Sequence, residues 1–233
     1  MRIHYLFNSG FLVELNKTWL IFDDCDDPAD VVRTRLAAES DVHLYIFVSH
    51  AHFDHFDPRI LDYAPRTEKY IFSRNVRHTK RARKFPADKT IYLEDYSTWQ
   101  DGTIAVQTFS STDVGTSFLV EADGRKIFHA GDFNWWHWTG DTAENQTLMK
   151  NAFMKQMKKL RGLSADVAFF PTDGRLEEAR DMGVNAFCAD TDIRALVTMH
   201  NVGYAPWQPS ADFPRQGLPY FSPAQPGEVW ELK

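Results

Sequence analysis

The chain has 233 residues, of which 43% are hydrophobic and 25% are charged, and its formal net charge is −6. This length and composition are typical of a globular protein with a full core, so we expect a single domain over residues 1–233. The acidic balance argues against general nucleic-acid binding, and the lack of a signal-peptide pattern or a long apolar run favours a cytoplasmic protein without a membrane span. The two cysteines, Cys25 and Cys188, lie outside any CxxC pattern and are expected to be free thiols.

Two stretches of the sequence resemble one another. FLVELNKTWLIFDD (residues 11–24) predicts two apolar strands around a polar turn. FLVEADGRKIFHAGD (residues 118–132) repeats this layout, with Asp123 and Gly124 as the turn signal. The shared Phe-Leu-Val-Glu suggests a protein of two related halves, although one matched tetrapeptide also arises by chance.

Several nearly continuous apolar runs predict strands that are covered on both faces. These runs occupy residues 41–50, 125–132, 166–173 and 194–200, and they end at His50, Asp132, Asp173 and His200. Ligands of open α/β sheets bind beyond the carboxyl ends of the strands. The four polar side chains are therefore expected to lie near a common site.

Helical patterns separate some of these strands. Residues 27–40 predict a helix with Pro28 in its first turn. Residues 143–162 predict another, with Met149, Phe153, Met157 and Leu160 on its buried face. Residues from about 205 onward hold six of the eleven prolines, which favours an irregular segment before a last strand near residues 229–232.

The stretch HAHFDH follows the strand that ends at His50. It places His50, His52, Asp54 and His55 within six residues. Imidazole and carboxylate together suit zinc, manganese or iron, and ligands at this spacing can serve two neighbouring ions. We therefore predict a metal centre with one or two ions, most readily zinc.

HAHFDH resembles the H-x-H-x-D-H signature of the metallo-β-lactamase superfamily. HAGD ending at Asp132 resembles the bridging aspartate of that superfamily, and VTMH ending at His200 resembles its last histidine. The resemblance covers roughly residues 1–205 and implies an α/β fold, an αββα sandwich of two pseudo-repeated halves with metals at one edge. The SGFLVE opening is most similar to the group that includes L-ascorbate-6-phosphate lactonase and N-acyl-phosphatidylethanolamine phospholipase D.

The sequence departs from that superfamily at one ligand. A further histidine is usual just before the second hairpin, where this chain has FSSTDVGTSF (residues 109–118). Asp113 is the replacement that we predict. His129 or His137 could instead reach the site, or that metal position could be weak or empty.

The resemblance implies a metal-dependent hydrolase in which a metal-bound hydroxide cleaves an ester, lactone or phosphodiester bond of a small, possibly anionic substrate. Asp54 would also orient or deprotonate the attacking water. The alternative is a metal-binding or sensor protein that hydrolyses nothing. A nuclease is disfavoured by the length and the charge, and a di-iron redox enzyme by the lack of an attached flavin domain. A homo-oligomer is compatible with the sequence.

Two clusters bear on the substrate. FNWWHW (residues 133–138) follows the strand that ends at Asp132, so Trp135, Trp136, His137 and Trp138 are expected in the pocket wall, with core packing as the alternative. SRNVRHTKRARKF (residues 73–85) holds six Lys or Arg residues and predicts a solvated helix face, or an anion site for a phosphorylated substrate. Asp173 and Arg175 are expected to support the site rather than to catalyse.

Overall fold

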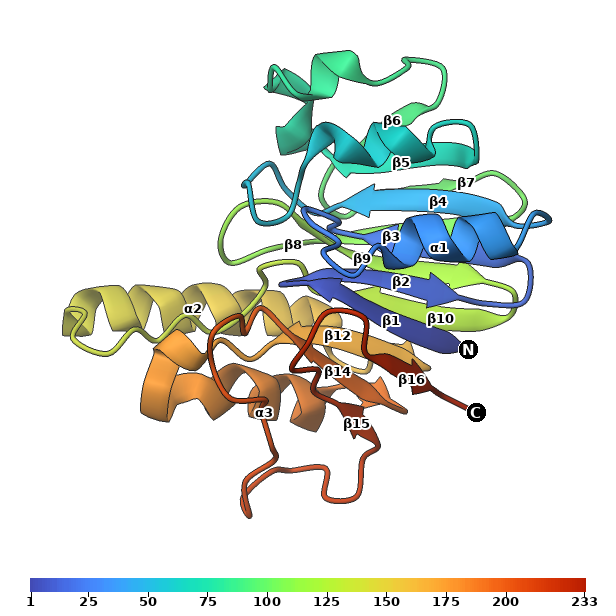
Figure 1. The fold of residues 1–233 in the computed structure, drawn as a ribbon. Helices are drawn as coiled ribbons and strands as arrows, with labels where there is room; N and C mark the ends of the chain where they lie inside the picture. The colour runs from blue at the N-terminus through green and yellow to red at the C-terminus, as the bar shows by residue number, and fades with distance from the viewer.

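The computed structural model describes residues 1–233 and consists of two seven-stranded sheets with helices on their outer faces (Figure 1). In the first sheet the strands are β16 (Val229–Glu231), β1 (Arg2–Phe7), β2 (Gly10–Glu14), β3 (Thr18–Phe22), β4 (His43–Val48), β5 (Thr67–Ser73) and β6 (Thr90–Leu93). In the second they are β15 (Tyr220–Phe221), β14 (Leu196–Met199), β12 (Val167–Pro171), β10 (Arg125–His129), β9 (Thr116–Ala122), β8 (Ile104–Ser110) and β7 (Thr98–Gln100). A small extra sheet pairs β11 (Ser164–Ala165) with β13 (Asp192–Ile193).

The helices complete four layers. Helix α1 (Val31–Ala38) covers the outer face of the first sheet, together with the short 3-10 helices η1 (Pro58–Tyr63), η2 (Arg74–His78) and η3 (Ala82–Lys84). Helices α2 (Ala143–Leu160) and α3 (Arg180–Asp190) cover the second sheet, and η4 (Gly174–Ala179) precedes α3. The predicted αββα sandwich is confirmed. None of the helices combines the length and apolar character that crossing a bilayer requires.

Alternation along the strands explains the two sheet faces. In β3, Leu20 and Phe22 pack between the sheets, whereas Trp19 and Ile21 pack under α1. Successive strand residues point to opposite faces, so an apolar run without polar breaks is what a strand between two covering layers needs. This is why the strands carry so few outward polar residues before their carboxyl ends.

The two predicted hairpins are present and related. β2 pairs with β3 and β9 with β10, both antiparallel, and each second strand then pairs in parallel with the next strand of its sheet. Phe22 and His129, at the ends of β3 and β10, stack across the sandwich with ring centres 4.9 Å apart and planes 3° apart. Asp123, in the second turn, accepts hydrogen bonds from the backbone of Lys17 and Thr18 in the first at 2.8 and 3.0 Å.

Two sequence predictions need correction. The helix predicted over residues 27–40 begins later, because both carboxylate oxygens of Asp27 accept from Val31 N and Val32 N and Asp30 has a positive φ of 51°. Pro28 therefore precedes the helix. The basic segment of residues 73–85 is not a helix face but the end of β5 and two 3-10 turns.

Other predictions agree with the structure. α2 spans Ala143–Leu160, and Phe153, Met157 and Leu160 are buried while Met149 is half-buried. Cys25 and Cys188 are free thiols. Most of the residues after 205 are irregular, but Trp207 and Phe213 are buried and β16 pairs with β1.

Candidate metal centre

The HAHFDH segment is a tight loop that follows β4 at the edge of the sandwich. The backbone N–H of Ser49 and its hydroxyl donate to the two carboxylate oxygens of Asp23 at 2.7 and 2.6 Å. On the other side of the loop, the guanidinium of Arg81 donates to the carbonyls of Ala51 and Phe56. The loop is therefore fixed at both ends by charged partners from other segments.

The loop meets residues of the second sheet to form groups of possible metal ligands. In each group the ligand atoms lie within 4.8 Å of one another. The three groups are His50, His55 and Asp132; Asp54, His55 and His200; and His52, Asp113 and Asp132. The structure thus brings together all seven residues that the sequence predicted as ligands.

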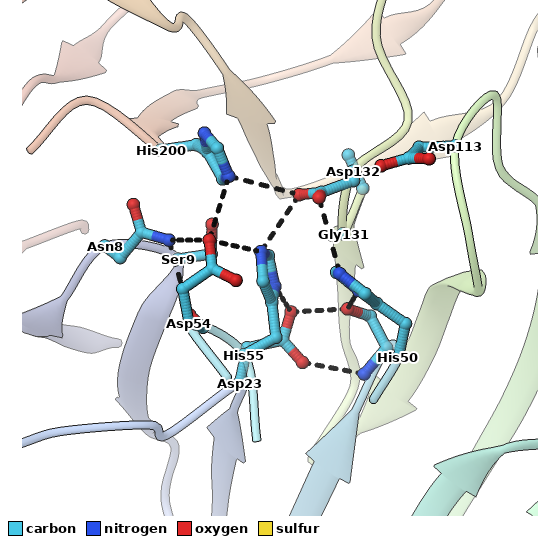
Figure 2. Close-up of polar contacts among 12 residues, drawn as sticks. Asn8, Ser9, Asp23, His50, Asp54, His55, Asp113, Gly131, Asp132 and His200 are labelled. Atoms are coloured by element: carbon cyan, nitrogen blue, oxygen red, sulfur yellow. Dashed lines mark hydrogen bonds and ion pairs between the residues drawn. The ribbon is translucent and has the colours of Figure 1, made fainter. Parts of the chain in front are cut away.

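Distances within the groups match those between ligands of one ion. Asp132 Oδ1 lies 3.0 Å from His55 Nε2 and 3.6 Å from His200 Nε2, while its Oδ2 lies 3.4 Å from His50 Nε2. Figure 2 shows Asp132 between these rings. Ligand atoms bonded to a tetrahedral ion at about 2.1 Å lie about 3.4 Å apart. Asp132 is therefore placed to bridge two positions.

The carboxylate of Asp54 belongs to the second group. Its Oδ2 lies 3.5 Å from His200 Nε2 and 3.7 Å from His55 Nε2, and it accepts a hydrogen bond from the Asn8 side chain at 3.2 Å. The Asp54 side chain is 29% exposed, more than the other residues of this group. It can therefore meet both a metal and a substrate.

The outer nitrogen of each buried histidine is oriented by another residue. Asp23 lies 2.8 Å from Nδ1 of His55, and Asp173 lies 3.0 Å from Nδ1 of His200. Nδ1 of His50 lies 3.0 Å from the Ser49 hydroxyl. Such partners fix the ring and leave Nε2 for a metal.

The buried nitrogen and oxygen atoms at the centre of the site are suited to bind a metal. His50 Nε2, His55 Nε2 and Asp132 Oδ1 are buried and form no hydrogen bond of good geometry, although the last two atoms lie 3.0 Å apart. Buried polar atoms normally have partners, and one ion could serve all three because they lie within 4.8 Å of one another. Nitrogen and carboxylate donors are the set that zinc, manganese and iron accept. The donors therefore fit a divalent metal.

The protein's own charges shift the pKa values of these groups. Burial opposes ionisation of Asp132, but the adjacent histidines, His55 above all, hold its pKa well below the usual range. Burial and the neighbouring His55 lower the pKa of His50 to about 4. Burial also disfavours charge on His200, yet the carboxylates of Asp173 and Asp54 raise its pKa to about 9. A metal must therefore displace a proton from His200 at neutral pH.

Asp113 lies within reach of two other predicted ligands. It groups with His52 and Asp132, whereas the other two candidates belong to no group of ligand atoms. His129 is buried behind the centre, where its Nε2 lies 3.0 Å from the Ser9 carbonyl. His137 lies on the loop after Asp132 but does not line the cavity of about 420 Å³ that opens beside the candidate metal centre.

Close backbone packing and positive φ angles hold the centre. A Cβ on Gly115 would lie 2.2 Å from the Ser49 carbonyl oxygen, so only glycine lets this loop approach. Asn8, Asp23 and His200 have positive φ angles of 51°, 44° and 59°. Non-glycine residues held in this region cluster at functional sites.

A cavity of about 420 Å³ opens beside the centre. It is lined by His52, Phe53, Asp54, Thr112, Asp113, Asp132, Trp136, Trp138, Met149, Arg175 and His200. A smaller hollow of about 240 Å³ adjoins it and shares Phe53, Asp54, Arg175 and His200.

The structure places the aromatic residues that follow Asp132 on two different sides of their loop. Trp136 lines the larger cavity, but Trp135 lies outside the lining and packs on Phe153 of α2 with ring centres 5.7 Å apart. Trp138, which was also expected in the wall, lines the cavity. His137 is absent from the lining as well. Trp136 and Trp138 therefore face the cavity, whereas Trp135 faces α2.

Two residues of the site escaped sequence reasoning. Asp23 orients His55, and Asn8 holds Asp54. Asp23 directly follows β3, as His200 follows β14, so the end of the first hairpin carried the same signal as the other strands. Asn8 lies in the turn between β1 and β2 and had no distinguishing pattern.

Comparison with known proteins identifies the fold. No family model and no curated protein matches the sequence. The structure is similar to Igni18, a novel metallo hydrolase from the hyperthermophilic archaeon Ignicoccus hospitalis KIN4/I, with a TM-score of 0.62 and 18% identity over 100% of this chain and 99% of that one. It is similar to the metallo-β-lactamase fold protein YhfI from Bacillus subtilis, with a TM-score of 0.54 and 10% identity over 99% of each chain. Zn²⁺-bound PqqB from Methylobacterium extorquens matches over the whole of both chains with a TM-score of 0.53 and 11% identity. The chain thus has the metallo-β-lactamase fold.

Proposed function

We propose that the protein is a metal-dependent hydrolase that cleaves an ester, lactone or phosphodiester bond of a small substrate. The observation that carries the proposal is the convergence of orphaned imidazole nitrogens and carboxylate oxygens from both sheets beside an open cavity. A site that only stabilised the fold would have no need of such a cavity. Zinc is the first choice of metal because the donors are imidazole and carboxylate, and the likeness to zinc-bound PqqB supports it.

The residues have distinct roles in this proposal. One ion would be held by His50, His52, Asp113 and Asp132. The other would be held by Asp54, His55, Asp132 and His200. The ligand atom of His55 also lies within 4.8 Å of those of His50 and Asp132. A divalent ion in such a site supplies hydroxide at neutral pH and polarises the oxygen under attack.

Asp54 is proposed as the residue that positions the attacking water and takes its proton. Its carboxylate touches both the ligand group and the cavity. Hydrogen bonds and charge from His200 and His55, against the effect of burial, lower the pKa of Asp54 to about 2, so it is ionised at neutral pH. Asn8 holds this carboxylate through its side-chain amide.

Trp136 links the cavity wall to the ligand strand. Its indole N–H donates to the carbonyl of Asp132 at 3.0 Å, and its ring lies 5.8 Å from that of His200. A bulky ring in this place excludes water from one side of the centre. The substrate is thus expected to enter from the side of Phe53 and Arg175, which are both exposed.

Metal analysis combined with turnover tests the proposal. Purified protein loaded with zinc and dialysed should contain two ions per chain, falling to about one in Asp113→Ala and in His200→Ala. His43→Ala, which alters an exposed histidine far from the ligand groups, is the control and should keep both ions. The loaded wild type should hydrolyse at least one of a phenyl ester, a γ-lactone and bis(4-nitrophenyl) phosphate.

The lactone in this panel also tests the narrower likeness to the lactonase-like group. Firm zinc binding without turnover of any of the three substrates would favour a metal-binding or sensor protein instead. Failure to bind any divalent metal would overturn the proposal.

A further inference from the structure

Arg175 is the one arginine or lysine that lines the two hollows beside Asp54 and His200. It is the second residue of η4 and lies two positions after Asp173, the aspartate that orients His200. Arg175 lines both hollows together with Asp54 and His200 of the candidate metal centre. A substrate that reaches Asp54 from the exposed side must pass this group.

The guanidinium is held rigidly but is not saturated. Nε lies 3.0 Å from both carboxylate oxygens of Asp173, and Nη2 lies 2.5 Å from Oδ2. The same group lies over the ring of Trp138, 5.3 Å from its centre. Nη1 has no hydrogen-bond partner within the protein, and the side chain is 53% exposed. A fixed, planar cation with a free edge is suited to a carboxylate or phosphate oxygen.

An apolar platform adjoins this cation. The rings of Trp136 and Trp138 are stacked, with centres 5.5 Å apart and planes 7° apart. Met149 of α2 lines the same cavity, and Phe53 lies on its rim with 84% of its surface exposed. An exposed phenylalanine beside stacked indoles is an apolar surface that a ligand can cover.

We propose that the substrate is an amphipathic anion, with an apolar group in the cavity lined by Phe53, Trp138 and Met149 and a carboxylate or phosphate bound by Arg175. This rests on the proposed function, because it names the substrate class of the same site. The volume of about 420 Å³ lies within the range of small-molecule sites, at its lower end, and suits a group of one or two rings. The anion site is Arg175 and not the basic segment of residues 73–85, where Arg81 is already bound to the HAHFDH loop.

Charge makes this binding depend on the metal. Asp54, Asp113 and Asp132 line the larger cavity and repel an anion, whereas bound divalent ions reverse the local charge. An amphipathic anion should therefore bind to the metal-loaded protein and not to the stripped one.

Binding of 2-naphthoate and of the neutral 2-naphthalenemethanol to zinc-loaded protein, measured by isothermal titration calorimetry, tests the proposal without any hydrolysis. The wild type should prefer the anion, and Arg175→Gln should lose about tenfold or more of the naphthoate affinity while the alcohol binds as before. Trp138→Leu should weaken both probes. Arg83→Gln, an exposed neighbour in the basic segment, is the control and should change neither. 2-Naphthyl phosphate in a parallel titration distinguishes phosphate from carboxylate recognition.

Arg175→Gln and the wild type are compared at equal zinc content. If Arg175→Gln loses its zinc, Arg175→Lys replaces it in the comparison, because lysine keeps the charge without the planar fork. Equal affinity for the anion and the alcohol would overturn the proposal. So would naphthoate binding that survives in Arg175→Gln, because the anion would then be bound by the metal alone. A protein that binds naphthoate through Arg175 but hydrolyses none of the ester, lactone and phosphodiester substrates would contradict the proposed hydrolase and leave the assignment of Arg175 as the anion site intact.

Discussion

Oδ2 of Asp23 lies 2.8 Å from Nδ1 of His55, and the same oxygen accepts the hydroxyl of Ser49 at 2.6 Å. One buried carboxylate, at the end of the first hairpin, thus fixes both His55 and the start of the HAHFDH loop. Asp23→Asn should lower zinc affinity by roughly 10- to 100-fold, because the amide holds the ring less well and makes His55 a weaker donor. Competition with a chromophoric chelator measures this affinity.

Asp24→Asn is the matched control for that change. The neighbouring carboxylate is equally buried but pairs with Arg59 instead of a ligand histidine. We expect Asp24→Asn to alter the midpoint of thermal unfolding and to leave zinc affinity unchanged. Equal loss of affinity in both variants would mean that Asp23 acts only through general stability.

The glycine at position 115 sets the distance between two loops. Its φ is +96°, and an added Cβ would lie 2.2 Å from the Ser49 carbonyl oxygen and 2.5 Å from Cβ of His50. Gly115→Ala should therefore cost about 3 kcal/mol or more in the free energy of unfolding and should displace His50. Denaturant unfolding and zinc content measure the two effects.

Gly102→Ala separates strain from collision in that experiment. Gly102 has a similar φ of +93°, but no atom lies within 4 Å of the position of its Cβ. This variant should cost about 1–2 kcal/mol and should keep its zinc. If both variants behaved alike, close packing against Ser49 would play no part.

Arg81 connects the basic segment to the loop that carries the ligands. Its guanidinium donates to the carbonyls of Ala51 and Phe56 and lies 4.9 Å from the centre of the Phe56 ring. Arg81→Met should cost about 3 kcal/mol, since two carbonyls lose a charged donor, and should weaken zinc binding. The exposed Arg83→Met should change neither thermal unfolding nor zinc affinity.

His200 gives the stripped protein a pH-dependent stability. Its pKa is about 9 in the fold and about 6.5 in an unfolded chain, so the folded state holds an extra proton between these values. The contribution is complete below pH 6.5 and is lost as the pH rises toward 9, with a total of roughly 3 kcal/mol. The unfolding temperature of EDTA-treated protein should fall across this window, and the fall should be smaller in His200→Gln. A wild-type profile no steeper than that of the variant would rule out this source of the dependence.

Local chemistry predicted the hairpins, the polar strand ends and the HAHFDH metal motif, whereas the αββα sandwich came from the resemblance to the metallo-β-lactamase superfamily. Apolar alternation and a turn such as Asp123-Gly124 predict a hairpin. Rare polar residues at the ends of apolar strands predict ligands. Such patterns depend on residues close together in sequence. The HAHFDH loop, Asp132 and His200 were therefore predictable, and their convergence followed from the parallel strands.

Features that depend on distant contacts were not predictable. The start of α1 is set by the Asp27 carboxylate and the turn at Asp30, and the orientation of Trp135 by the presence of α2. Arg81 looked like a surface charge until the fold placed it beneath the loop. Asn8 has no local pattern, because only the tertiary structure brings it to Asp54.

Each of the three ligand groups takes members from both sheets of the sandwich: His50, His52, Asp54 and His55 follow β4, whereas Asp113, Asp132 and His200 come from the second half. An ion held there would link the two halves of the sandwich. Because a ligand that binds only the native state adds to its stability, at roughly 2.7 kcal/mol for a free concentration of 100 times Kd, the chain would be most resistant to unfolding where the metal is plentiful. Metal supply would then govern the lifetime of the protein as well as its chemistry.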